Sequence, residues 1–406
     1  MDLPLSVLVM FPLLAAIAPI LAAAAGRLVR IPLVVFEIVL GMVCGPAVLG
    51  WVTPTGTTEK LANLGLCMLF FLAGNEIDFR RIRGRPLNSS IVGWLFALVL
   101  GVGAAFALAP QPAAAIFIGV ALTSTALGTL MPILRDAGEL RTPFGAAVIA
   151  IGAVGEFGPL IAISLFLSGR QPGVATVVLL GFVVITAVAI VLAGRGPHAG
   201  LTSLVTATLH TSGQFAVRLV ICLLLLLVAL SLLLGLDMLL GAFAAGVIAK
   251  LLLAGAPPRD KESIEGKLEA VGFGFLVPIF FISTGLTFDL DALLAQPLTL
   301  VLVPVFLVLL LVVRGSSTLF TSRGLPRADR RAVMLLGATG LPIVVAVTDI
   351  GVDSGDLPAG TAAALVGAAM LSVLLYPLIG LALHRRAPDG GVKPADRDVP
   401  EIAEEG

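Results

Sequence analysis

Apolar runs of about 18–25 residues recur from one end of the chain to the other, and short polar segments separate them. A run of this length is long enough to cross a bilayer as a helix. The pattern predicts an all-α polytopic membrane protein with thirteen transmembrane helices. The expected spans are residues 7–25, 32–50, 60–78, 88–108, 113–134, 143–168, 173–193, 214–234, 236–254, 268–287, 298–321, 331–350 and 358–383. Residues 1–386 would form the membrane domain, and the polar segment 387–406 a disordered cytoplasmic tail.

Composition supports a membrane protein and excludes several classes of function. Charged residues make up 12% of the 406 residues, against about 25% in soluble proteins. The formal net charge is zero, so no nucleic-acid partner is expected. The sequence contains no GxxxxGK[ST] string and no His/Cys/Asp cluster, so neither ATP hydrolysis nor a metal enzyme is indicated. We expect no enzyme activity and no cofactor.

Charge along the chain predicts how the spans are oriented. Lys and Arg concentrate in every second connection, whereas Lys60 and Arg170 are the basic residues in the alternate ones. Cytoplasmic connections of membrane proteins carry the excess of basic residues. We therefore expect a cell-membrane protein with its N-terminus outside and its C-terminus in the cytoplasm. The expected outer connections carry the acidic residues Asp289, Asp291, Asp353 and Asp356.

Two predicted spans, 113–134 and 331–350, contain residues that favour an interrupted helix. The residues at their centres are Thr123, Ser124 and Thr125 in the first, and Thr339, Gly340 and Pro342 in the second. Proline removes a backbone donor and clashes with the preceding turn, and glycine lowers the cost of unwinding. The alternative is that the Thr and Ser hydroxyls bond to their own helical backbone.

The two interruptions fall at matching places in the chain. If spans 1–6 and 8–13 form two inverted six-helix repeats, each interruption lies in the fifth helix of its repeat. Interrupted helices at corresponding positions of two repeats are the best sequence indication of a transporter's binding site.

Glu156 is the most unusual residue, because it lies in the middle of the apolar run 144–167. A carboxylate at this depth costs roughly 2.5–3.5 kcal/mol on insertion scales and usually marks an ion or proton path. We therefore interpret Glu156 as a site that binds either a proton or a metal cation. The alternative is a protonated glutamate hydrogen-bonded to a neighbouring helix.

Arg314 is the second unusual charge, within the apolar segment LVLLLVVRGSSTLF. Its expected role is to compensate the charge of Glu156 or to cap carbonyl groups freed at the two interruptions. The alternative is an arginine that extends to the inner membrane surface. Structural or vestibule roles are expected for Glu37, Glu76, Asp237 and Asp349, and solvated positions for His198 and His210.

Five strings carry a resemblance to a known family. They are IPLVVFEIVLGMVCGP, LGLCMLFFLAGNEIDF, ALTSTALGTLMPIL, LGAFAAGVIAK and IEGKLEAVGFGFLVPIFFISTGLTFDL. Together they resemble the membrane domain of the monovalent cation/proton antiporter-2 group. The resemblance implies a thirteen-helix antiporter fold with two crossing, interrupted helices, and a homodimer formed through a panel domain.

The resemblance also implies the site. The family's ion-binding acid lies on the sixth span, where Asp-Asp, Asn-Asp or Gln-Asp is usual, and this chain has Gly155-Glu156 instead. The family's basic residue on the eleventh span corresponds to Arg314. With one carboxylate, we expect electroneutral exchange of Na⁺ or K⁺ for H⁺ at Glu156, with oxygen ligands from the two interruptions. The alternatives are a proton-coupled organic solute transporter on the same fold and a membrane sensor that does not transport.

Overall fold

The computed structural model describes residues 5–26, 31–77, 82, 84–109, 111–166, 172–194 and 214–385. Its elements are α1 (Leu5–Ala25), α2 (Leu33–Cys44), α3 (Gly56–Glu76), α5 (Arg85–Leu108), α6 (Pro112–Leu122), α7 (Leu127–Asp136), α8 (Pro143–Phe166), α9 (Pro172–Gly194), α11 (Phe215–Leu233), α12 (Met238–Leu252), α13 (Pro258–Val271), α14 (Val277–Leu286), α15 (Leu290–Leu294), α16 (Pro297–Leu309), α17 (Gly315–Thr321), α18 (Arg327–Gly337), α19 (Pro342–Asp353) and α20 (Ala359–Arg385). Two π-helical turns, Gly272–Leu276 and Leu310–Arg314, join α13 to α14 and α16 to α17. The predictions for His198, His210 and the tail 387–406 lie outside the described residues.

Every predicted span coincides with a helix or with a pair of consecutive helices, which confirms the all-α membrane class. Within the described part of the chain, nine helical segments are long and apolar enough to cross a membrane, and three more apolar helices are shorter. The remaining predicted span is α3, whose ends carry Glu59, Lys60 and Glu76. These helices and their apolar surfaces indicate a multi-pass membrane protein.

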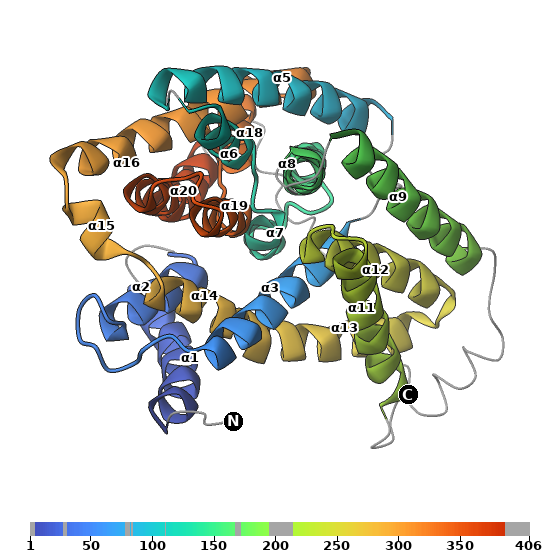
Figure 1. Ribbon diagram of the computed structural model, residues 1–406. Coiled ribbons are helices and arrows are strands. Elements are labelled where there is room, and N and C mark those ends of the chain that lie inside the picture. Colours follow the sequence, from blue (N-terminus) through green and yellow to red (C-terminus); the bar gives the residue numbers. More distant parts are fainter. Residues whose placement is uncertain are drawn as a thin grey trace, which may run out of the picture.

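The helices form two bodies (Figure 1). The first body contains α1, α2, α3 and α11–α14, and the second contains α5–α8 and α16–α20. Within the first body α2 and α14 pack at backbone distance, because a Cβ atom at Gly41 would overlap the Ile282 carbonyl oxygen and one at Gly285 the Ile38 carbonyl oxygen. Glycine at a helix interface allows this close approach in membranes. Between the bodies, α3 contacts α7, α8 contacts α12 and α2 contacts α20, while α9 packs against both α12 and α8, and α15, which follows α14, packs against α20.

Both predicted interruptions are present in the second body. Residues 123–126 separate α6 from α7, residues 338–341 separate α18 from α19, and both segments are buried. The segments meet, since the Ala126 N–H donates to the Thr339 carbonyl oxygen at 2.7 Å, and α19 packs on α6. The sequence therefore predicted two interrupted helices at one place in the fold. The inverted-repeat relation between the two halves stays a prediction.

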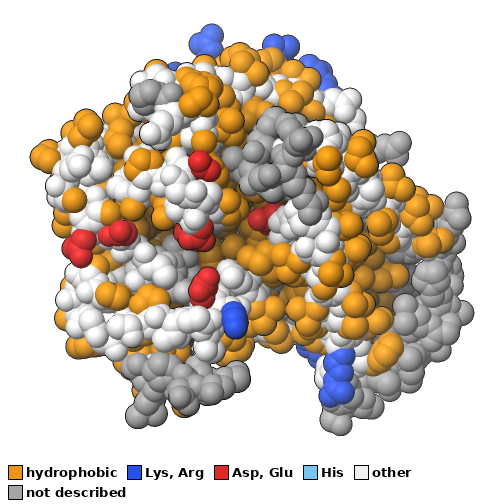
Figure 2. Space-filling model, viewed as in Figure 1, with side chains coloured by type: hydrophobic (Ala, Val, Ile, Leu, Met, Phe, Trp, Pro, Cys, Tyr) orange, Lys and Arg blue, Asp and Glu red, His pale blue; other side chains and the backbone are white. Residues whose placement is uncertain are grey.

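Acidic side chains gather near the middle of one face of the molecule, while Lys and Arg lie mostly toward its edge (Figure 2). Asp349 lies within electrostatic range of Asp353 and Glu59. Asp353 and Glu59 are exposed at ends of spans that the charge pattern assigns to the outer side. Asp237 has the structural role expected for it, because its carboxylate accepts from the Leu239 N–H at 2.8 Å and caps α12.

A buried histidine near the end of one helix of the second body contacts residues at the ends of two others. His384 near the end of α20 approaches Asp329 at the start of α18 through Nδ1 (2.8 Å) and Glu139 before α8 through Nε2 (3.0 Å). Its ring stacks on Phe144, with ring centroids 4.0 Å apart. A protonated His384 would therefore pair with two carboxylates at once and hold the ends of α8, α18 and α20 together.

Replacing His384 by alanine leaves two carboxylates near each other without a cation between them. We expect His384→Ala to lower the free energy of unfolding by about 1–3 kcal/mol, the cost of leaving buried polar groups unpaired. The difference from wild type should shrink at pH values high enough to deprotonate His384, because the wild type then loses the same pairing. Thermal unfolding in detergent as a function of pH measures this, with Glu262→Gln at an exposed position of α13 as the control. Equal unfolding temperatures for wild type and His384→Ala at every pH would contradict the expectation.

Candidate ion-binding site

Glu156 lies in α8, 1% exposed, beside the crossing of the two interruptions. Both of its carboxylate oxygens are buried, and neither has a hydrogen-bond partner among the described residues. The carboxylate faces the backbone N–H groups of Leu127 and Gly128 in the first turn of α7, without reaching ordinary hydrogen-bond geometry. A helix N-terminus carries partial positive charge and favours an anion. The arrangement tolerates a carboxylate while leaving its oxygens free for a proton or a cation.

Three hydrogen bonds hold the interruptions next to Glu156. The Thr125 N–H donates to the Gly155 carbonyl oxygen at 3.0 Å, which ties the first interruption to α8. The Thr125 hydroxyl donates to the Gly337 carbonyl oxygen at 2.6 Å, at the C-terminal end of α18. Together with the bond from Ala126 to Thr339, these contacts bring α7, α8 and α18 to one point.

Two of the hydroxyls predicted as ligands are engaged with their own helices. Thr123 Oγ1 donates to the Val120 carbonyl oxygen at 2.7 Å, and Thr339 Oγ1 donates to the Leu335 carbonyl oxygen at 3.3 Å. This is the alternative that the sequence left open for Thr and Ser residues in membrane helices. These two residues can still offer their backbone carbonyl groups to an ion.

Of the other predicted ligands, Thr125 bonds to both Gly337 and Arg314, and Ser124 and Gly340 differ from it. Ser124 Oγ is buried and has no partner among the described residues. The Gly340 N–H donates to Ser372 Oγ at 3.2 Å, so a side chain of α20 supports the second interruption. Ser372 carries no signal in the sequence, because serine in a membrane helix most often bonds to its own backbone. Ser124 is therefore the hydroxyl left free at the crossing.

Arg314 is buried at the end of a π-helical turn and is 1% exposed. Its guanidinium donates to Thr125 Oγ1 (2.7 Å), Ser317 Oγ (2.8 Å) and the Ile151 carbonyl oxygen (2.6 Å). These acceptors are neutral, and no ion pair joins Arg314 to Glu156 in the part of the chain that the structure describes. The one carbonyl group among them, that of Ile151, lies within α8 and not at an interruption, so the roles expected for Arg314 stay predictions.

Arg314 and Thr125 form a continuous link to the second interruption. The guanidinium donates to the Thr125 hydroxyl, and that hydroxyl donates to the Gly337 carbonyl oxygen. The C-terminal end of a helix carries partial negative charge, which a nearby cation stabilises. Through the Thr125 hydroxyl, the positive charge of Arg314 therefore stabilises the C-terminal end of α18 at the second interruption.

The packing around position 155 leaves no room for a side chain on the residue before Glu156. A Cβ atom at position 155 would overlap Arg314 Nη2 and would lie 2.6 Å from Thr125 Oγ1. The guanidinium thus fills the space that a polar side chain would occupy. The glycine at position 155 departs from the pattern that the resemblance implies, and the close approach of the Arg314 guanidinium requires this glycine.

A cavity of about 1100 Å³ lies alongside the site. Its lining includes Gly128 and Thr129 at the start of α7 and Arg135 at the end of the same helix, so the cavity follows α7 from the crossing toward the surface. Glu37 of α2 and Leu381 of α20 line its walls. The cavity therefore separates the two bodies on the side where α7 ends.

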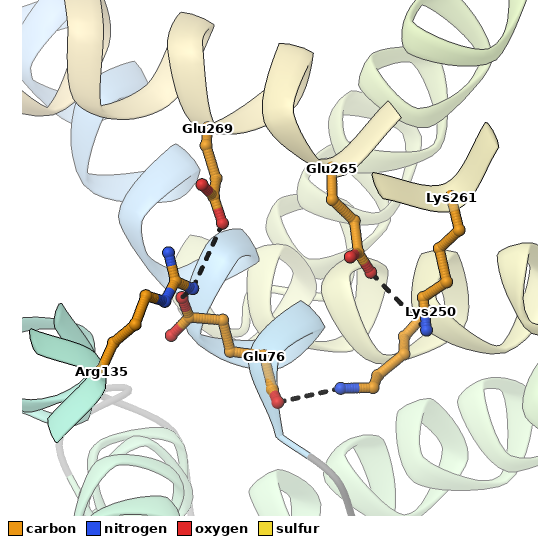
Figure 3. Close-up of polar contacts among 6 residues, drawn as sticks. All are labelled: Glu76, Arg135, Lys250, Lys261, Glu265 and Glu269. Atoms are coloured by element: carbon orange, nitrogen blue, oxygen red, sulfur yellow. Dashed lines mark hydrogen bonds and ion pairs between the residues drawn. The ribbon is translucent and has the colours of Figure 1, made fainter. Parts of the chain in front are cut away.

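Two ion pairs join the bodies at Arg135, an exposed residue that lines the cavity and marks its mouth (Figure 3). Arg135 of α7 pairs with Glu76 of α3 at 3.1 Å and with Glu269 of α13 at 3.4 Å. Lys250 of α12 donates to the Glu76 carbonyl oxygen at 2.9 Å. A structural or vestibule role was expected for Glu76. Its observed contacts are the ion pair with Arg135 and the hydrogen bond from Lys250 to its carbonyl oxygen.

The chain is similar to known proteins over most of its length. The family described as "Sodium/hydrogen exchanger, transmembrane" matches residues 13–382. Bacillus cereus GerN, named as a Na(+)/H(+)-K(+) antiporter, is 28% identical over 267 residues, which cover 64% of this chain and 67% of GerN. Bacillus subtilis YjbQ, whose name assigns Na(+)/H(+) antiport provisionally, is 27% identical over 375 residues, or 88% of this chain. The match spans 59% of the length of YjbQ.

A solved structure shares the arrangement of helices. The sodium proton antiporter MjNhaP1 from Methanocaldococcus jannaschii, determined at pH 8, superposes with a TM-score of 0.67. The match covers 92% of this chain and 97% of MjNhaP1, at 14% sequence identity. At this identity the likeness concerns the fold, and it confirms the antiporter fold that the sequence predicted.

The contact between Gly155 and Arg314 can be tested by adding one methyl group. We expect Gly155→Ala to displace the guanidinium and to lower the free energy of unfolding by about 1–3 kcal/mol, as overpacking of a tight interior does. Gly103→Ala in α5 is the matched control, because a Cβ atom there meets nothing within 4 Å. Thermal unfolding of both variants measures the effect. If Gly155→Ala is as stable as Gly103→Ala, the guanidinium does not depend on the missing side chain.

Proposed function

The chain belongs to the sodium/hydrogen exchanger family, as its motifs predict, and on this premise we propose that it exchanges Na⁺ or K⁺ for H⁺ at Glu156. The observation that carries this proposal is the buried carboxylate with two unpartnered oxygens at the crossing of two interrupted helices. An unpaired polar group in the membrane interior is costly, so its retention indicates use. The names of the relatives support cation/proton antiport as the class of activity.

The proposed exchange is electroneutral. Glu156 carries either a proton or a monovalent cation, and in both forms the loaded carboxylate is neutral. Arg314 keeps its charge in both forms, because its contacts are with neutral acceptors. The two loaded states therefore carry the same net charge, and one cation moves for each proton.

Oxygen atoms at the crossing are the proposed cation ligands, together with the Glu156 carboxylate. The hydroxyl of Ser124 is free to contribute, and the carbonyl groups of the interruptions 123–126 and 338–341 lie at helix ends. Discontinuous helices present such ends to transported ions in many transporters. Hydroxyl and carbonyl oxygens suit hard cations such as Na⁺ and K⁺.

Alternating access is proposed to occur by movement of the second body against the first. The cavity between the bodies supports this, since it leads to the first turn of α7 from one side of the molecule. The basic charge pattern makes that side the cytoplasmic one in our proposal. A homodimer through the first body is proposed from the family resemblance alone.

Proton flux in proteoliposomes tests the role of Glu156. We expect Na⁺ or K⁺ to drive proton release in wild type, Glu156→Gln to abolish it, and Glu156→Asp to retain part of it, because aspartate keeps the carboxylate one methylene shorter. Glu262→Gln, at an exposed position, should behave as wild type. Cation-driven exchange by Glu156→Gln would remove Glu156 from the mechanism. Proton-coupled uptake of an organic solute without Na⁺ or K⁺ would support the alternative transporter.

The same vesicles test electroneutrality when the membrane potential is clamped. We expect the exchange rate of wild type to be unchanged, within about twofold, between 0 and 100 mV, because moving one net charge through 100 mV is worth about 2.3 kcal/mol. A rate that follows the applied potential would require a stoichiometry other than one to one.

The ion pairs of Arg135 test the relative movement of the two bodies. They exist in the state whose cavity is open, so Arg135→Ala should disfavour that state. Exposed pairs contribute about 0.2–1 kcal/mol, so we expect the apparent cation affinity on the cavity side to fall by about 1.5- to 5-fold. Lys261→Ala is the control, since it removes a pair within α13 alone (3.8 Å to Glu265). An equal effect of both variants would exclude a specific role of the pairs between the bodies.

A further inference from the structure

Glu37, like Glu156, is a buried carboxylate, and it lies on the cavity that follows α7. It lies in α2, is 3% exposed, and lines the cavity from the first body. No hydrogen bond or ion pair is formed by its side chain within the described residues. Across the cavity, Gly128 and Thr129 belong to α7 of the second body. The two carboxylates are therefore carried by bodies that are proposed to move relative to each other.

Thr129 is a polar residue on the opposite, second-body wall of this cavity. Its side chain is 7% exposed, lines the cavity, and leaves Oγ1 buried without a partner among the described residues. A buried hydroxyl without a partner is uncommon and calls for an explanation such as water or an ion. Gly128, next to it, lines the cavity while its backbone N–H faces the Glu156 carboxylate.

We propose that Glu37 and Thr129 form an entry site for a hydrated monovalent cation, from which the cation passes to Glu156. The inference rests on the proposed function. A cavity of about 1100 Å³ has room for many waters at about 30 Å³ each, so the cation keeps most of its hydration shell here. Such a site raises the local cation concentration and discriminates little among Na⁺, K⁺ and Li⁺. Selection among them then occurs at Glu156, where the ion loses its water.

Charges at the mouth do not oppose cation entry. Arg135 also lines the cavity, but it is paired with both Glu76 and Glu269 (Figure 3). With Lys250, whose ammonium donates to the Glu76 carbonyl oxygen, these four side chains carry no net formal charge when both carboxylates are ionised.

Transport measured from each side of the membrane tests the entry site. We expect Glu37→Gln to raise the apparent KM for Na⁺ and for K⁺ by about tenfold on the cavity side alone, with maximal rates within about twofold of wild type. Glu37→Asp should restore most of the affinity, and Thr129→Val should cause a smaller increase on the same side. Glu262→Gln is the control for loss of an acid away from the cavity. An unchanged KM on the cavity side, or equal changes on both sides, overturns the proposal.

Chemical modification tests binding without relying on transport or on a Glu37 variant. Dicyclohexylcarbodiimide modifies carboxyl groups in apolar surroundings, and mass spectrometry of Glu156→Gln protein reports the modification of Glu37. We expect Na⁺, K⁺ and Li⁺ to protect Glu37 to a similar extent, and choline not to protect it. Modification that no alkali cation slows overturns the entry site. Failure of the proposed function is distinct, because wild-type vesicles would then show no cation-driven proton flux.

Discussion

The hydrogen bond from the Arg314 guanidinium to the Thr125 hydroxyl is the interaction on which the site depends. Interrupting two helices inside a membrane frees backbone groups that lipid cannot satisfy. Thr125 resolves this at three points, because its N–H bonds to Gly155, its hydroxyl bonds to Gly337 and its oxygen accepts from Arg314. With these groups satisfied by one another, the Glu156 carboxylate and the Ser124 hydroxyl are left without hydrogen-bond partners at the crossing, among the described residues.

The sequence could predict the residues whose presence in lipid is expensive. Glu156, Arg314 and Pro342 each violate the rules for an apolar helix, so their positions in the chain are enough to indicate the site and the interruptions. The two interrupted helices followed from the same kind of signal, whereas the antiporter fold followed from the five strings that resemble the exchanger family. What these residues contact did not follow, because contacts between distant segments have no local signature.

Specific residues illustrate that limit. The Leu127 and Gly128 N–H groups that face Glu156 belong to the backbone, and the identity of a residue does not reveal which group its backbone N–H will face. The hydroxyls of Thr123 and Thr339 fit a ligand role in the sequence but bond to their own helices in the structure. His384 lies far along the chain from Glu139 and Asp329, and only folding brings them together.

The absence of a side chain at position 155 limits which substitutions this site can accept. Because the guanidinium of residue 314 occupies the vacant volume, any larger amino acid at 155 requires arginine to shorten or turn away first. The residue that position 155 can accept therefore depends on the residue at position 314, and the effects of substitutions at the two positions should not be additive.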